Sequence, residues 1–277
     1  MQYVVSSYSR QRRAHRGLVH RWLYEHGILH RDLSLNNIMW RMIKEMNKAT
    51  GVAEKKVCGV LTDYDLSSWT ASLTTDYTKT SNQRTGTPPF MARGLLDGTD
   101  TLHMYRHDVE SLFYVILILA THYEIQAPSE VEDGGIRTRQ GLGELPYQAW
   151  FDQPSYKTLA SFKQTFFSNL EDLDLSPTLE SLRGWLDQLQ DSFSCGFTAK
   201  QEYRRQSRMQ QKQRSLKKDQ TEESRAKGTP AAFNDETLGG HLTYSALIGP
   251  VGDLTGELEG LAVRYPPKSP PTSTDTS

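Results

Sequence analysis

Three polar residues in the N-terminal third of the chain could together carry out phosphoryl transfer. Asp32 and Asn37 stand five positions apart in LHRDLSLNNIMW, residues 29–40, and Asp63 stands in VLTDYDL, residues 60–66. Phosphoryl transfer needs a group that orients the attacking hydroxyl, and cations that neutralise the moving phosphate. An Asp can do the first task, and Asn and Asp supply the oxygen ligands that Mg²⁺ prefers. Taken alone, the same residues would more often be turn residues beside a hairpin.

The composition indicates an intracellular protein, cytoplasmic or nuclear. The chain has 277 residues, of which 36% are hydrophobic, so it can bury one large core or two modest ones. A net charge of −1 gives no global reason to expect nucleic acid or an anionic membrane as a partner. Two cysteines cannot form a disulfide framework, which favours a reducing compartment. The best apolar run, VILILA at 115–120, is too short to span a bilayer.

Hydrophobic periodicity predicts the elements that must position these residues. A helix over 13–26 should end at Gly27, and a nearly all-apolar helix from Asp108 to Tyr123 should be buried. The predicted set is helices 13–26, 108–123, 155–170 and 177–193, and strands 38–43 and 57–62. The two strands read as a hairpin.

Three segments lack a regular pattern. Residues 63–94 are rich in Ser, Thr, Asn and Gly, and so long an irregular segment is usually functional or disordered. Residues 200–227 hold ten Lys or Arg against four Asp or Glu, which we interpret as part of a flexible basic insertion over 200–230. That run could also be a nuclear address or a polyanion-binding patch, but a solvated helix or loop is the preferred interpretation. Residues 250–277 have the composition of a disordered tail.

Further stretches give the sequence a family resemblance. RTGTPPFMARGLL (84–96) resembles the substrate-docking loop of protein kinases, and HDVESLFYVILIL (107–119) resembles their central helix. Together with LHRDLSLNNIMW, GVLTDYDLSSW and DETLGGHLTY they resemble the fungal-type protein kinase family over roughly residues 13–245. The family implies an α+β protein kinase-like fold. Residues 1–249 would be its mainly α-helical C-terminal lobe, in which a small β-hairpin carries the catalytic and metal-binding loops.

The resemblance assigns segments and roles. The expected segments are a helix and catalytic loop (13–37), an activation segment (63–94) and a central helix (108–123). The expected activity is Mg²⁺-assisted phosphorylation of protein Ser or Thr hydroxyls by ATP.

Individual residues take roles by the same resemblance. Asp32 would be the base, Asn37 and Asp63 would hold Mg²⁺, and Thr87 would touch Asp32 and position the acceptor. Met39 would form the floor under adenine.

Arg31 is predicted as a further catalytic residue, and three more residues would support the site. Arg31 would receive a phosphate carried by the 63–94 segment. Asp108 would hold the backbone of the catalytic loop, and His30 would stack with Tyr64.

The sequence also departs from the usual kinase pattern. Ser34 stands where Ser/Thr kinases usually have Lys, and Asp65 replaces the Gly of the DFG-type motif. Gly94 replaces the Glu of the APE-type motif, so we expect a buried ion pair to a later Arg to be lost.

No glycine-rich loop, strand Lys or hinge segment fits before Leu29. We therefore expect a truncated kinase that is weakly active or inactive, and that self-associates through its exposed inter-lobe face. One alternative is a non-catalytic pseudokinase or protein-docking module, which Ser34 and Gly94 favour. A second is a small-molecule kinase, against which GTPPFMA and the Asp108 helix speak.

Overall fold

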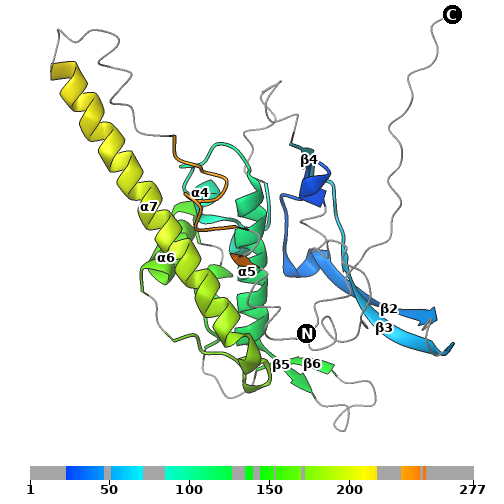
Figure 1. The fold of residues 1–277 in the computed structure, drawn as a ribbon. Helices are drawn as coiled ribbons and strands as arrows, with labels where there is room; N and C mark the ends of the chain where they lie inside the picture. The colour runs from blue at the N-terminus through cyan, green and yellow to red at the C-terminus, as the bar shows by residue number, and fades with distance from the viewer. Residues whose placement is uncertain are drawn as a thin grey trace, which may run out of the picture.

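A computed structural model gives the fold of most of the chain (Figure 1). It describes residues 23–46, 51–70, 85–126, 135–139, 144–152, 154–169, 172–216, 232–243 and 246–247. Within these residues helices and small antiparallel sheets occur together, so the α+β prediction is confirmed. The predicted helix 13–26, apart from its last turn, lies outside them, as do residues 217–230 and the tail 250–277.

The strands of the described residues form three two-stranded antiparallel sheets. The pairs are β1 (Ile28–Leu29) with β4 (Ser68–Trp69), β2 (Ile38–Met46) with β3 (Ala53–Leu61), and β5 (Tyr123–Gln126) with β6 (Gly135–Thr138). The β2–β3 hairpin pairs Ile38 with Leu61 and Met46 with Ala53. Its strands are therefore longer than the predicted 38–43 and 57–62, and the hairpin extends away from the helices (Figure 1).

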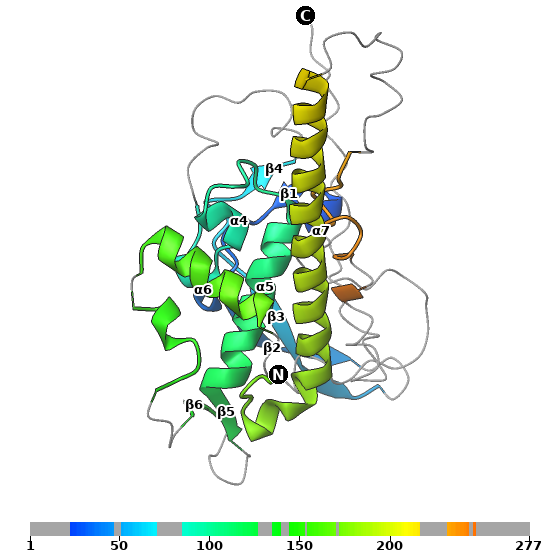
Figure 2. The same cartoon turned by 90° about the vertical axis from the view of Figure 1, so that its left-hand side faces the viewer.

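Helix α5 lies at the centre of the helical part. The helices are α4 (Arg93–Leu96), α5 (Tyr105–His122), α6 (Tyr156–Ser168) and α7 (Arg183–Leu216). The hairpin lies on one side of α5, and α6 and α7 lie on the other (Figures 1 and 2). Helix α5 begins three residues before the predicted start, and Met104 takes the N-cap position. Asp108 is therefore one turn inside the helix and does not cap it.

Aromatic side chains from these three helices form the core. Phe113 of α5 is fully buried, and its ring packs against Phe167 of α6 and Phe193 of α7 at centroid distances of 6.0 and 5.6 Å. Burying such large apolar groups is the main term that holds α6 and α7 against α5. Among the described helices, none combines the length and the apolar content needed to cross a bilayer.

The prediction of a flexible basic insertion over 200–230 is wrong for residues 200–216. They form the second half of α7, which continues without a break to Leu216 (Figure 1). The segment contains no Gly or Pro and is rich in Gln, Arg and Lys, which are good helix formers. Since the first half of α7 is anchored in the core, each further residue adds a helical hydrogen bond without a new nucleation cost.

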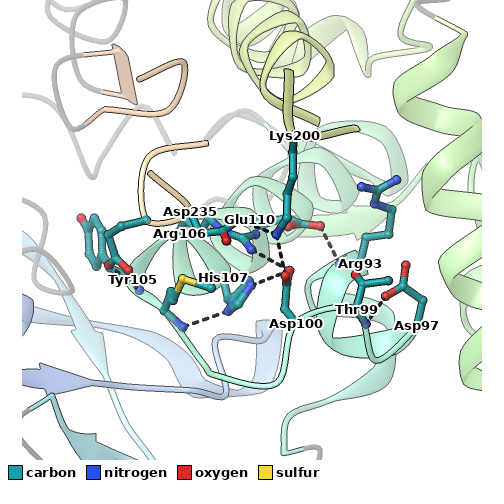
Figure 3. Close-up of polar contacts among 12 residues, drawn as sticks. Arg93, Asp97, Thr99, Asp100, Tyr105, Arg106, His107, Glu110, Lys200 and Asp235 are labelled. Atoms are coloured by element: carbon teal, nitrogen blue, oxygen red, sulfur yellow. Dashed lines mark hydrogen bonds and ion pairs between the residues drawn. The ribbon is translucent and has the colours of Figure 1, made fainter. Parts of the chain in front are cut away.

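A buried polar cluster joins the start of α5 to α7 (Figure 3). Asp100 accepts hydrogen bonds from Arg106 Nη2 and Lys200 Nζ, both at 2.6 Å, and its Oδ2 lies 3.3 Å from His107 Nε2. Met104 N donates to His107 Nδ1 at 2.9 Å, so the ring proton of the neutral His107 is on Nε2, facing Asp100. Burial, and then the nearby Arg106 charge, lower the pKa of His107 from 6.5 to about 3.

This cluster predicts a loss of stability in mild acid. Folded His107 stays neutral down to about pH 3, whereas the unfolded ring takes up a proton near pH 6.5. Its contribution to the free energy of unfolding is therefore complete above pH 6.5 and falls below it, by at most about 1.4 kcal/mol per pH unit. The measurement is the free energy of unfolding in urea at several pH values between 4 and 8. In His107→Gln this free energy should fall less steeply below pH 6.5 than it does in wild type. The exposed control His241→Gln should follow wild type, and an unchanged slope in His107→Gln would contradict the prediction.

Candidate active site

The loop that carries Asp32 is anchored at its start by Asp108 of α5. His30 N donates to Asp108 Oδ2 at 2.9 Å, and Arg31 N donates to Asp108 Oδ1 at 3.1 Å. Asp108 is 2% exposed, so these are bonds to a buried carboxylate and are strong ones. These two bonds fix the orientation of the loop that follows strand β1 relative to α5.

Asp32 is held from two directions. Thr87 donates to Asp32 Oδ1 from both its backbone N and its Oγ1, each at 2.8 Å. Asn37 Nδ2 donates to Asp32 O at 2.8 Å and to Asp32 Oδ2 at 3.2 Å. Three residues separated by up to 55 positions in sequence therefore meet at one carboxylate, which is half-buried and still reachable from solvent.

The His30 ring ties this loop to the end of the hairpin. Its Nε2 lies 2.9 Å from Thr62 O, and its Nδ1 lies 3.4 Å from Asp32 N, which assigns the proton to Nε2. Thr62 N in turn donates to Asn37 O at 2.9 Å. Asp63 follows Thr62 directly, so the structure brings Asn37 and Asp63 to the same end of the hairpin.

Two residues of the site have backbone conformations that non-glycine residues rarely adopt. Arg31 has φ of 71° and Asp63 has φ of 61°. Such residues cost about 1–3 kcal/mol each and tend to cluster at functional sites. Residues 71–84 lie outside the described residues, so the role of Arg31 as a phosphate receiver stays a prediction.

The donors at this end of the hairpin fit Mg²⁺. Because Asn37 Nδ2 is engaged by Asp32, the atom of Asn37 that could face an ion is its carbonyl oxygen. Asp63 is exposed and adds a carboxylate. Among the described residues, no group of three or more His, Cys, Asp or Glu could hold a metal alone. An amide and a carboxylate suffice for Mg²⁺, which keeps several waters and binds substrate phosphates as well.

The strand after Asn37 presents an apolar surface. Ile38, Met39 and Trp40 are 36%, 55% and 65% exposed. Met39 is therefore accessible to a ligand, although its contact with adenine stays a prediction, as does self-association through this face. The ring of Tyr64 packs edge-on against His30 at 5.1 Å, and burial raises the pKa of the Tyr64 hydroxyl.

Two buried side chains hydrogen-bond to the backbone of residues 85–96, which we call the docking segment. Lys163 of α6 is fully buried and donates to Pro89 O at 2.9 Å and to Met91 O at 2.5 Å. Glu110 of α5 accepts from Arg93 N at 2.7 Å. Phe90 N and Met91 N donate to Thr87 O, so the contacts made by Lys163 and Glu110 also help to fix the position of Thr87, which bonds to Asp32.

Sequence analysis missed Lys163 and Glu110. A signal for Lys163 existed, since it stands four residues from Leu159 and four from Phe167, on the buried face of α6. A Lys on an apolar stripe needs buried acceptors, which makes it a candidate for a backbone clamp. Glu110 gave no such signal, because α5 is buried almost all round.

Gly94 has no carboxylate of its own, and the expected loss of an ion pair from this position to a later Arg stays a prediction. The Asp100 carboxylate lies beside Gly94 and pairs with the buried Arg106 and with Lys200, at 2.6 Å in each case. The buried cations are thus compensated by an acid six positions further along the chain.

Comparison with known proteins agrees with this geometry. Residues 18–120 match the model of the family described as fungal protein kinase. No curated protein matches the chain. The matched range contains the loop of Asp32, the hairpin, the docking segment and nearly all of α5. Over residues 18–120, this chain is therefore similar to the fungal protein kinase family.

Proposed function

We propose that the chain is a weakly active protein kinase-type phosphotransferase, which transfers the terminal phosphoryl group of ATP to a Ser or Thr hydroxyl of a protein with Mg²⁺. The observation that carries the proposal is the Asp32 carboxylate. It is fixed by two bonds from Thr87 and approached by Asn37 at the end of the hairpin that also bears Asp63. The family match supports the same reaction class.

Asp32 would orient the acceptor hydroxyl and accept its proton. Both bonds from Thr87 go to Oδ1, at 2.8 Å, and among the described residues only the longer 3.2 Å bond from Asn37 goes to Oδ2. Oδ2 therefore retains capacity to accept a hydrogen bond from an incoming hydroxyl. General-base assistance requires this kind of positioned contact, worth about 10²–10⁴-fold in rate.

Asn37 and Asp63 would hold Mg²⁺, which when bound would neutralise charge on the phosphates of ATP. Asp63 brings a full charge and Asn37 only a dipole, so Asp63 should matter more. Ser34 supplies no cation, and it is only 1% exposed. At this position of the loop no cation faces the phosphates of ATP, so Mg²⁺ would have to neutralise their negative charge.

A non-catalytic docking module is the second candidate, and Ser34 is the residue that favours it. Gly94 favours it less, because Asp100 places a carboxylate beside Gly94, where it pairs with Arg106 and Lys200. A phosphotransferase and a docking module can be distinguished by measuring whether the chain transfers any phosphate.

The first test measures transfer from radiolabelled ATP to a mixture of acceptor proteins by the 277-residue chain with Mg²⁺. Asp32→Asn and Asp63→Asn should each reduce transfer by about 100-fold or more, since they remove the base and the charged metal ligand. Asp191→Asn, an exposed carboxylate on α7, is the matched control and should transfer normally. No transfer by the unaltered chain would contradict the proposed activity, and transfer by Asp63→Asn equal to that of the unaltered chain would refute the role of Asp63.

A second test addresses Thr87. Thr87→Ala keeps the backbone bond to Asp32 but loses the Oγ1 bond, a bond to a charged group worth about 1.5–3 kcal/mol. We expect kcat to fall by about 10- to 100-fold, with a smaller change in KM for ATP. Thr87→Ser keeps the hydroxyl and should retain most of the activity. Equal loss in both variants would show that the methyl packing of Thr87, and not its hydroxyl, is required.

A further inference from the structure

The carboxylate of Asp100 occupies the space in which residue 94 would place a side chain. A Cβ built on Gly94 would lie 1.8 Å from Asp100 Oδ2 and 2.7 Å from its Cγ. Asp100 N also donates to Gly94 O at 3.0 Å. The position of the Asp100 carboxylate therefore depends on the glycine at 94, because any side chain at residue 94 would occupy the same space.

The partners of Asp100 come from two helices (Figure 3). Arg106 of α5 is 1% exposed, and Lys200 of α7 is 5% exposed. Within the described residues, Asp100 is the carboxylate that pairs with Arg106, whereas Lys200 also pairs with Asp235 at 2.6 Å. A buried guanidinium without a carboxylate would be costly, so Asp100 is the group that allows Arg106 to be there.

We propose that Asp100 is a positioning residue for the docking segment, and that it supplies from the following loop the carboxylate that Gly94 lacks. Through Gly94 it holds the α4 end of the segment against α5 and α7. Lys163 and Glu110 hold the middle of the same segment. The inference rests on the proposed function only where it calls this segment the docking site of the acceptor.

Moving the carboxylate back to position 94 tests the proposal. In wild type, Gly94→Asp should lower the melting temperature, because the new side chain collides with the Asp100 carboxylate and repels it. In an Asp100→Gly background the same substitution should raise the melting temperature, because the space is empty and Arg106 and Lys200 lack their acid. Gly94→Asn is the matched control, with the same shape and no charge, and should give no such rise.

The sign of the effect decides the outcome. A rise caused by Gly94→Asp but not by Gly94→Asn, seen only in the Asp100→Gly background, supports a relocated charge. Equal losses from Gly94→Asp in both backgrounds, or an equal rise with Asn, would overturn it. Neither ATP nor an acceptor is present, so failure of the proposed catalysis leaves this result unaffected.

Amide hydrogen exchange separates positioning from general stabilisation. Leu95 N and Leu96 N both donate to Ala92 O at 3.1 Å within the segment. In Asp100→Asn, which keeps the shape but removes the charge, their exchange should accelerate about 10-fold or more beyond that of the amides near Leu117 in the core of α5. Equal acceleration in both regions would show that Asp100 adds stability everywhere and positions nothing.

Discussion

The buried carboxylate of Asp108 is the constraint on which the site depends. A carboxylate that is 2% exposed must be compensated, and here the compensation comes from two backbone N–H groups of the catalytic loop and from His103 Nε2 at 2.8 Å. The loop must therefore present His30 N and Arg31 N to α5. That requirement is met by the left-handed backbone of Arg31, and it leaves Asp32 facing the docking segment.

The docking segment, on the other side of Asp32, is also held by buried polar side chains that bond to its backbone. Lys163 and Glu110 are almost fully buried charges, and both have partners on the backbone of the docking segment. A backbone partner survives changes of side chain, so the shape of the segment is set by α5 and α6 more than by its own residues. Lys163 also lies over the rings of Tyr114 and Trp150, at 3.8 and 5.2 Å from their centroids. Burial lowers its pKa well below the usual value.

Sequence patterns were sufficient where local spacing determines structure. The β-capable runs of the hairpin and the apolar run of α5 are each local patterns, and they predicted the hairpin and the buried central helix that the structure shows. The basic run after Lys200 was misread because charge pattern alone does not distinguish a loop from the continuation of an anchored helix. The ion pair of Asp100 with Lys200 was not predicted for a different reason. The two residues are 100 positions apart, and no sequence spacing links them.

The central claim is that Asn37 and Asp63 form a metal site next to Asp32. The most direct measurement is nuclear magnetic resonance with Mn²⁺ and a non-hydrolysable ATP analogue, because the paramagnetic ion broadens signals only near where it binds. The account predicts selective broadening of the amides of Asn37, Asp63 and Met39 at metal concentrations that leave the exposed α7 residue Asp191 sharp. Uniform broadening, or broadening centred away from the open end of the hairpin, would contradict it.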